Sequence, residues 1–319
     1  MPLLGRFPAL RGLPRARLCT LPSPVELLPS ISGCGDIWIK RDDLNAPRGG
    51  GNKVRTLEFL LGNVKPGDSV LTVGGAGSNH VLSTAIHTAR LGAVATAFRW
   101  RHDMNPAADL TAARIATEMP GNDVGRSAVL AVARARIRGL SPHIHYIPIG
   151  GSSPLGVMGH VNAALELADQ ISAGCLPRPS RIVLPLGSGG TTAGLLLGFA
   201  IAGMDIEIVG ARVGPRFFSR ARVLGLARQT ARLIERLTGD KLPSVDPSRL
   251  RIAHNVYGGA YGRPLKLATD AAARLKQATG VLLDDTYSAK AFLAALDEAR
   301  PARGPTLFWL TFDSRCLTN

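Results

Sequence analysis

Short apolar runs alternate with longer amphipathic stretches along most of the chain. The apolar runs are rich in Val, Ile and Leu and have the length of buried strands, whereas the stretches between them repeat apolar residues with a helical period. The expected strands are residues 36–40, 69–73, 94–98, 143–149, 181–186, 206–211, 251–257 and 305–311. The expected helices are residues 79–91, 107–118, 126–138, 157–171, 192–204, 219–238, 264–279 and 289–300, with another that begins near residue 52. This alternation predicts an α/β fold with parallel-rich sheets covered by helices.

The bulk composition favours a large globular chain with an excess of positive charge. Of its 319 residues 45% are hydrophobic, which is enough for a core divided between two domains. Basic residues outnumber acidic ones by 38 to 23, giving a formal net charge of +15. The arginines are scattered and aromatic residues make up 5%, so we expect no nucleic-acid partner, although clusters at residues 134–138 and 216–222 keep that alternative open. The positive field also suits an anionic cofactor or substrate.

Three further features limit the kind of protein. The four cysteines lack metal-site or redox spacing, so we expect no metal ion and a reducing, cytoplasmic setting. The longest apolar run, residues 193–204, is too short to span a bilayer, so no membrane partner is expected. The first 25 residues hold several prolines and no acidic side chain, which predicts an extended arm packed on the body instead of an amphipathic helix.

The stretch 49–55 (Gly-Gly-Gly-Asn-Lys-Val-Arg) is a glycine run that leads into a helix with Lys53 in its first turn. Asn52 is placed to cap that helix, so Lys53 would lie at the positive end of the helix dipole, where a cation is disfavoured. A residue that breaks a local rule in this way is expected at a functional site. An exposed lysine after a glycine turn is the alternative.

A second glycine loop, residues 187–190 (Gly-Ser-Gly-Gly), joins an apolar strand to an apolar helix. Closely spaced backbone N–H groups, together with the hydroxyls of Ser188, Thr191 and Thr192, are typical of a phosphate site at a helix N-terminus. The stretch is not a P-loop, because no Gly-Lys-Ser/Thr ends it, and Thr192 stands where a dinucleotide fingerprint has its third glycine. A phosphate monoester suits this short loop best; a tight turn that needs glycine only for packing is the alternative.

A third loop, residues 74–80 (Gly-Gly-Ala-Gly-Ser-Asn-His), also ends a strand and begins a helix. Ser78 or Asn79 could cap that helix, and capping alone would explain the loop. The same amides and polar side chains could bind a carboxylate. A phosphate site, a lysine at a helix start and a carboxylate loop together indicate pyridoxal phosphate, with the lysine as its Schiff-base partner and the ring as an electron sink.

The chain resembles the D-cysteine desulfhydrase and 1-aminocyclopropane-1-carboxylate deaminase family in the ordered stretches 38–44, 50–55, 77–80, 150–156 and 187–191. The resemblance extends from about residue 21 to residue 309. It implies a two-domain, fold type II pyridoxal-phosphate enzyme, like the β subunit of tryptophan synthase, with the cofactor in the interdomain cleft. It also implies a large cofactor-binding domain of residues 1–55 and 157–319, a small inserted domain of residues 56–156, and a homodimer.

The same resemblance assigns roles to individual residues. Lys53 is similar to the family's Schiff-base lysine, preceded by Asn52, and Asn79 to the residue that binds the phenolic oxygen of the cofactor. The phosphate site is assigned to Gly187, Ser188, Gly189, Gly190 and Thr191. The substrate carboxylate is assigned to Ser78, Asn79 and His80, with Ser78 also near the reacting carbons.

Residues near the C-terminus distinguish reactions within the family. Tyr261 and Tyr287 match its two active-site tyrosines, with a buried packing role as the alternative for each. Ser288 aligns with the residue that faces the pyridine nitrogen, which is glutamate in the cyclopropane deaminases. A hydroxyl leaves that nitrogen neutral, which suffices when a β-leaving group departs, so Ser288 favours β-elimination over ring-opening deamination.

Two departures from the family pattern bear on substrate choice. Residues 310–313 read Leu-Thr-Phe-Asp where the family has His-Thr-Gly-Gly, and Ala289 stands where glycine is typical. Side chains added beside a ligand site are expected to narrow the pocket or push the backbone away.

The sequence therefore predicts a pyridoxal-phosphate-dependent lyase that performs β-elimination on a small amino acid. D-cysteine or a related β-substituted amino acid is the expected substrate, giving pyruvate, ammonia and the leaving group. The catalytic candidates are Lys53, Ser78, Tyr261 and Tyr287. Three alternatives stay open: another pyridoxal-phosphate reaction (cyclopropane deamination, racemisation or β-replacement), a catalytically silent cofactor-binding protein, and a nucleic-acid-associated protein.

Overall fold

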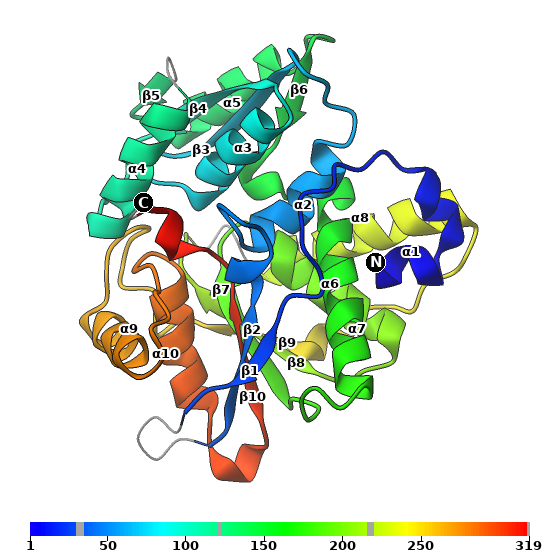
Figure 1. Ribbon diagram of the computed structural model, residues 1–319, viewed down its shortest axis with the longest axis vertical. Coiled ribbons are helices and arrows are strands. Elements are labelled where there is room, and N and C mark those ends of the chain that lie inside the picture. Colours follow the sequence, from blue (N-terminus) through cyan, green and yellow to red (C-terminus); the bar gives the residue numbers. More distant parts are fainter. Residues whose placement is uncertain (30–34, 120–122, 216–219, 318–319) are drawn as a thin grey trace.

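The computed structural model describes residues 1–29, 35–119, 123–215 and 220–317, and its strands form two separate sheets (Figure 1). The larger sheet has six strands in the order β1-β2-β10-β7-β8-β9. Its strands are β1 (Val25–Leu27), β2 (Ile37–Arg41), β7 (Arg181–Leu186), β8 (Glu207–Arg212), β9 (Leu250–Ala253) and β10 (Thr306–Leu310). Among the described strands of this sheet, the edge strand β1 pairs antiparallel with β2 and the other pairings are parallel.

The smaller sheet has four parallel strands in the order β5-β4-β3-β6. They are β3 (Ser69–Gly75), β4 (Val94–Trp100), β5 (Asp123–Gly125) and β6 (Ile144–Ile147). The accompanying helices are α3 (Asn79–Arg90), α4 (Pro106–Glu118) and α5 (Ala128–Arg138). The α/β class with parallel-rich sheets is confirmed. All four strands of this sheet lie inside the segment 56–156, but the domain boundaries themselves stay a prediction.

Helices cover both faces of the larger sheet. Successive side chains of a strand point to opposite faces, so strands that are apolar throughout need a cover on each face. The covering helices are α6 (Pro154–Ser172), α7 (Gly190–Ala202), α8 (Arg220–Thr238), α9 (Lys266–Thr279) and α10 (Ser288–Glu298). The helix α2 (Asn52–Leu60) instead packs on α6, and its Val54 and Leu57 share a core with Val70 and Ile147 of the smaller sheet. On β7, Ile182 and Leu184 join the core under α6 and α7, whereas Val183 joins the core under α9 and α10. Figure 1 shows these two helical layers on either side of the sheet. The continuous apolar runs of the sequence are explained by this two-sided burial.

The N-terminal arm corrects one expectation. Its first residues form a short helix, α1 (Pro2–Arg6), followed by a 3₁₀ turn at Pro8–Gly12, and both place proline at the helix start. Proline is tolerated there because the first N–H of a helix has no intrahelical acceptor. Leu3 and Leu10 are buried in the large core. An extended arm was therefore the wrong prediction for residues 2–12.

Other differences concern ends and short strands. The pattern missed the short strands β1 and β5, and it extended the strand after residue 250 too far, since β9 ends at Ala253.

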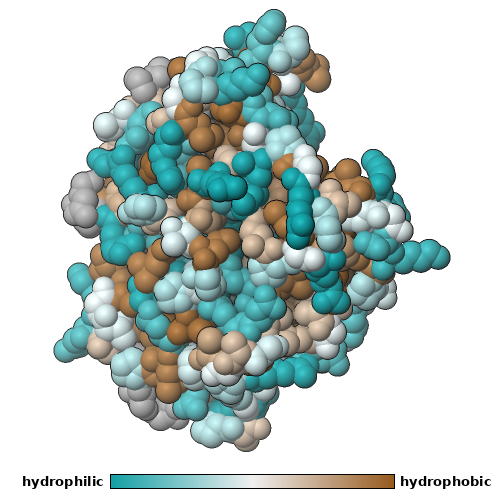
Figure 2. All heavy atoms as spheres, turned by 45° about the vertical axis from the view of Figure 1, so that its right-hand side comes forward, coloured by the Kyte–Doolittle hydropathy of each residue, from teal (hydrophilic) through white to brown (hydrophobic). Residues whose placement is uncertain are grey.

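Cys34, and residues 216–219 of the expected arginine cluster, lie outside the described residues. The arginine cluster at residues 134–138 is on α5, a helix that also exposes the apolar side chains of Val129, Leu130 and Ile137. Hydrophilic and hydrophobic side chains are interspersed over the face shown in Figure 2.

A buried ion network anchors α2 to the larger sheet. Arg55 donates to Asp42 Oδ1 at 2.6 Å and to Glu166 Oε2 at 2.9 Å, and Lys40 donates to Glu166 Oε1 at 2.7 Å. Trp309 Nε1 donates to the other oxygen of Asp42 at 2.8 Å. Two cations balance two anions in this network, and charges buried so deeply are tolerated only when they are paired and hydrogen-bonded. The network fixes α2 relative to β2, β10 and α6.

Candidate active site

Lys53 lies in the first turn of α2, directly after a tightly constrained glycine run. Gly51 is the residue before the helix and has φ +133°; a Cβ there would clash with the backbone oxygen of Thr311. Only glycine therefore fits at this position. Lys53 Nζ donates to Gly150 O at 3.1 Å. Burial of the ammonium group lowers the pKa of Lys53 from 10.5 to about 8.

Asn52 does not cap α2, contrary to the sequence prediction. The helix begins at Asn52 itself, and the preceding Gly51 offers no side chain for capping. The Asn52 side chain instead donates from Nδ2 to Thr191 Oγ1 at 2.8 Å. Its function in the structure is to connect the lysine-bearing helix with the start of α7.

The glycine loop after β7 has the features of an anion site. The helix α7 begins at Gly190, and Gly189 before it has φ +88°, a left-handed conformation that favours glycine. Its first-turn N–H groups have no intrahelical acceptors, and the Thr192 hydroxyl is buried with no hydrogen-bond partner among the described residues. Ser188 Oγ accepts from Ser152 Oγ at 2.6 Å, which ties the loop to the turn after β6. These donors fit the phosphate group of pyridoxal phosphate.

His160 is a site neighbour that the sequence offered no reason to select. It lies on α6, and its Nε2 is 2.9 Å from Thr56 Oγ1 and 3.4 Å from Thr191 Oγ1. Burial, and then the positive charges of Lys53 and Arg55, lower the pKa of His160 well below 6.5, so the ring is neutral. It joins α2 and α7 through a second set of hydrogen bonds.

The loop after β3 presents the start of α3 to the same region. Ser78 precedes the helix but makes no side-chain cap, and Ser78 and Asn79 are both buried. The His80 ring faces the sheet, where Nε2 lies 2.9 Å from Thr72 Oγ1. Burial, together with the charge of Lys53, lowers the pKa of His80 to about 3. Because the neutral His80 ring is engaged with the sheet, the first-turn N–H groups are the natural donors for a carboxylate at this helix start.

Tyr261 and Tyr287 form a hydroxyl pair. Their hydroxyl groups share a short hydrogen bond, and their rings meet edge to face with centroids 5.9 Å apart. Burial raises the pKa of Tyr261 to about 12 and raises that of Tyr287 well above 10. A Cβ at Gly187 would lie 3.6 Å from the Tyr287 ring, and one at Gly75 would lie 3.2 Å from the Tyr261 ring. The pair thus lies between the glycine loop of residues 187–190, here called the phosphate-type loop, and the glycine loop of residues 74–80, here called the carboxylate-type loop. Both phenols are protonated at neutral pH.

Ser288 is the first residue of α10 and is completely buried. Its N–H and that of Tyr287 donate to the two oxygens of Asp284, which anchors the start of the helix. Burial raises the pKa of Asp284, and the hydrogen bonds from Ser288 and Tyr287 offset part of that rise. Ala289, where the family has glycine, packs in a small core with Ala268 and Ala272.

The C-terminal segment that departs from the family pattern, residues 310–313, contacts the glycine run before Lys53 directly. Thr311 O accepts from Asn52 N at 3.0 Å, Phe312 pairs with Gly51 in an isolated bridge, and Asp313 N donates to Gly50 O at 3.1 Å. These contacts hold the segment against the glycine run, and the effect of its added side chains on the pocket stays a prediction. Phe312 belongs to the same buried core as Val81 and Leu82 of α3, the helix that follows the glycine loop of residues 74–80.

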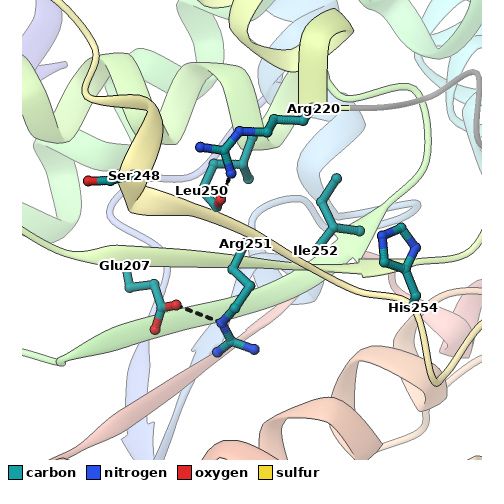
Figure 3. A pocket seen from close by; sticks show the side chains of 7 residues that line it. All are labelled: Glu207, Arg220, Ser248, Leu250, Arg251, Ile252 and His254. Atoms are coloured by element: carbon teal, nitrogen blue, oxygen red, sulfur yellow. Dashed lines mark hydrogen bonds and ion pairs between the residues drawn. The ribbon is translucent and has the colours of Figure 1, made fainter.

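A separate cavity lies away from these residues. It has a volume of about 420 Å³ and is lined by Glu207, Arg220, Ser248, Leu250, Arg251, Ile252 and His254 (Figure 3). Arg251 pairs with Glu207 at 2.7 Å, and Arg220 donates to the backbone oxygen of Leu250 at 2.5 Å. These charged groups are thus engaged with protein atoms, and the lining includes none of the residues assigned to the cofactor.

Neither a membrane span nor a metal site is present among the residues that the structure describes. They contain no helix long and apolar enough to cross a bilayer. They also contain no group of three or more His, Cys, Asp or Glu side chains arranged to hold a metal ion.

Comparison with known proteins agrees with the chemistry of the site. Residues 17–311 match the model of the family described as pyridoxal-phosphate dependent enzyme. The chain is 37% identical to nocardicin C-9' epimerase of Nocardia uniformis subsp. tsuyamanensis, over 95% of this chain and 94% of that protein. It is 31% identical to D-cysteine desulfhydrase of Salmonella paratyphi A, over 94% of each chain. A crystal structure of an ACC deaminase homologue superposes with a TM-score of 0.76 at 29% identity, covering 98% of this chain and 94% of the other. The chain belongs to the pyridoxal-phosphate-dependent enzyme family.

Proposed function

We propose that this enzyme is a lyase that catalyses β-elimination on a small amino acid, D-cysteine or a related β-substituted amino acid. The observation that carries the proposal is the meeting of three groups at one place: Lys53, the phosphate-type loop before α7, and the protonated Tyr261–Tyr287 pair. The similarity to D-cysteine desulfhydrase supports the same class of reaction.

The cofactor would be held at both ends by this chain. We assign the phosphate to the loop at Gly187, Ser188, Gly189, Gly190 and Thr191, with Thr192 as an additional donor. Lys53, next to Asn52, would carry the covalent link, Asn79 would donate to the phenolic oxygen, and Ser288 would face the ring nitrogen. When bound, pyridoxal phosphate withdraws electrons from the substrate Cα and acidifies its proton.

The lowered pKa of Lys53 and the raised pKa values of Tyr261 and Tyr287 indicate how each group would act. A lysine with a pKa of about 8 is partly unprotonated near neutral pH, so Lys53 can take the Cα proton once the substrate has displaced it. The tyrosine pair stays protonated because its pKa values are raised, so its hydroxyl groups can donate a hydrogen bond to the departing thiolate. The carboxylate of the substrate would be held by Ser78 and by the N–H groups of Asn79 and His80.

Epimerisation at Cα is the second candidate, because the relative that is 37% identical over 95% of this chain is named an epimerase. Inversion needs a group that removes the Cα proton on one face and a group that returns a proton on the other. Lys53 and the tyrosine pair could serve as those two groups. Both candidates therefore share the first proton transfer and differ in the second step, which is loss of the leaving group in one and return of a proton to Cα in the other.

One experiment separates the candidates. Purified enzyme is incubated in D₂O with D-cysteine, L-cysteine and β-chloroalanine, and the products are examined for pyruvate and for the opposite enantiomer labelled at Cα. Pyruvate with the leaving group supports β-elimination, whereas a labelled enantiomer without pyruvate supports epimerisation. A cofactor spectrum with neither product would support a catalytically silent protein. Lys53→Ala should lose both the visible cofactor absorbance and turnover, while Lys266→Ala, at an exposed ion pair with Asp270, should keep both.

Three coarser features are proposals of the same kind. We propose a homodimer, which light scattering of the purified protein tests. We propose a reducing cytoplasmic location, in keeping with the free cysteines Cys19, Cys175 and Cys316, which cell fractionation tests. We propose that residues 56–156 form an inserted domain, and limited proteolysis near these boundaries tests that division.

A further inference from the structure

We propose that Asn105 is a positioning residue that holds the Tyr261–Tyr287 hydroxyl pair together from the opposite sheet. It precedes α4, in the connection that follows β4 of the smaller sheet. The two tyrosines belong to loops that pack on the larger sheet. The catalytic importance of the pair rests on the proposed function, but its geometry does not.

Asn105 contacts both tyrosine segments through a single amide group. Its Nδ2 donates to Gly262 O at 2.6 Å and to Thr286 Oγ1 at 2.9 Å. Gly262 follows Tyr261 directly, and Thr286 directly precedes Tyr287. One –NH₂ group has two hydrogens, so both are used to connect these two segments.

The orientation of the amide is determined by its third bond. Oδ1 of Asn105 accepts from Ala108 N at 2.9 Å and so caps α4. A flipped amide would place its oxygen against Gly262 O and lose the cap. Asn105 is 4% exposed and Thr286 is 3% exposed, so these bonds form in a dry region where unpaired polar groups are costly.

The surrounding contacts show how closely the two parts approach here. A Cβ on Gly262, which has φ +85°, would clash with the backbone oxygen of Asp103, so only glycine fits. The His102 ring meets the Tyr261 ring edge to face, with centroids 4.6 Å apart, and His102 Nε2 accepts from Gly77 N at 3.2 Å. Arg263 pairs with Asp103 at 2.9 Å at the surface. Asn105 is the buried part of this junction and contacts both tyrosine segments.

A purely structural role as a helix cap can be separated from a positioning role. Asn105→Ser keeps a side-chain acceptor for the cap but is too short to reach Gly262 and Thr286. Thr286→Val removes one acceptor from the other side while Asn105 stays intact. Ser127→Ala is the matched control, because Ser127 caps α5 through Leu130 N at an exposed site far from the tyrosines in sequence.

The first readout needs neither cofactor nor substrate. Protein labelled with ¹³Cζ-tyrosine gives one signal for each of its four tyrosines, and replacing Tyr261 or Tyr287 by Phe assigns two of them. In the parent protein these two signals should not titrate below pH 11, since the pKa of Tyr261 is about 12 and that of Tyr287 is also raised. In Asn105→Ser at least one of them should titrate closer to pH 10, as the pair separates and water enters. Thr286→Val should shift the same signals, and Ser127→Ala should shift neither.

The second readout is catalytic. Asn105→Ser should lower kcat by roughly 10²-fold, the usual effect of misplacing an acid–base group, with KM changed much less. Unchanged tyrosine titration in folded Asn105→Ser and Thr286→Val proteins would overturn the inference. If the tyrosine titration shifts in Asn105→Ser but the parent protein itself turns over none of the test amino acids, the proposed function is refuted and the positioning role of Asn105 stands.

Discussion

Replacing Lys53 by Met should make the apoprotein more stable at neutral pH. The pKa of Lys53 falls from 10.5 to about 8 because the folded protein disfavours its charged form. A difference of 2.5 units (10.5 − 8) is about 3–4 kcal/mol at about 1.36 kcal/mol per unit, and allowance for the partial solvent exposure of the Lys53 side chain lowers this upper bound to about 3 kcal/mol. Methionine has a similar length and no charge, so it should remove that penalty.

The pH dependence gives the prediction its sign. Between pH 8 and pH 10.5 the unfolded chain still binds a proton at Lys53 that the folded chain has released, so the stability of the parent protein rises with pH in this window. Lys53→Met lacks this rise. Its advantage should therefore be full below pH 8, shrink steadily above it and vanish near pH 10.5.

The assay is urea unfolding of both apoproteins at several pH values between 7 and 10.5. Lys266→Met serves as the control, because Lys266 is exposed and pairs with Asp270 on the same helix. That control should show no comparable gain at neutral pH. A Lys53→Met protein that is no more stable than the parent at pH 7, or whose gain persists unchanged at pH 10.5, would refute the reasoning.

Three other variants probe the ion network, the phosphate-type loop and the start of α10. Glu166→Gln should destabilise the protein by about 3–5 kcal/mol in urea unfolding, because it removes one anion from a buried network with two cations; Glu26→Gln, at an exposed ion pair, should cost less than about 1 kcal/mol. Gly189→Ala should destabilise by about 1–2 kcal/mol and weaken cofactor binding in spectroscopic titrations, because Gly189 has φ +88°; equal affinity would argue against the phosphate assignment. Ser288→Glu should lower the rate of β-elimination by about tenfold, because a carboxylate facing the ring nitrogen would keep that nitrogen protonated and hold in the ring the electrons that expel the leaving group, whereas Ser288→Thr should nearly retain the rate. An unchanged rate for the glutamate variant would show that this residue does not tune the ring.

The sequence predicted features whose cause is local. Glycine loops that come after apolar strands are placed at the carboxyl ends of parallel strands, so the loops around Lys53, Ser78 and Gly187 could be expected to meet. The structure brings these stretches together with Tyr261 and Tyr287. Their individual roles at the cofactor stay predictions until the variants above are measured.

Features that depend on long-range contacts could not be predicted in this way. Asn105 and Thr286 are 181 positions apart, and His160 reaches Thr56 across 104 positions. Nothing in the sequence around Asn105 or around His160 indicates that such a distant partner exists. The misplaced Asn52 cap has the same origin, because Thr191 is 139 positions away and draws the amide towards the start of α7.

The position of Lys53 depends on the residue two places after it. Successive helical residues are about 100° apart, so residues 53 and 55 point to nearly opposite sides of α2. On one side Arg55 is held by Asp42 and Glu166 in a neutral, buried network; on the other side Lys53 Nζ donates to a neutral backbone oxygen, that of Gly150. The strongly held arginine prevents the helix from turning the poorly solvated lysine towards water. The ion network therefore keeps Lys53 in an environment that lowers its pKa, and weakening the network should raise that pKa as well as reduce stability.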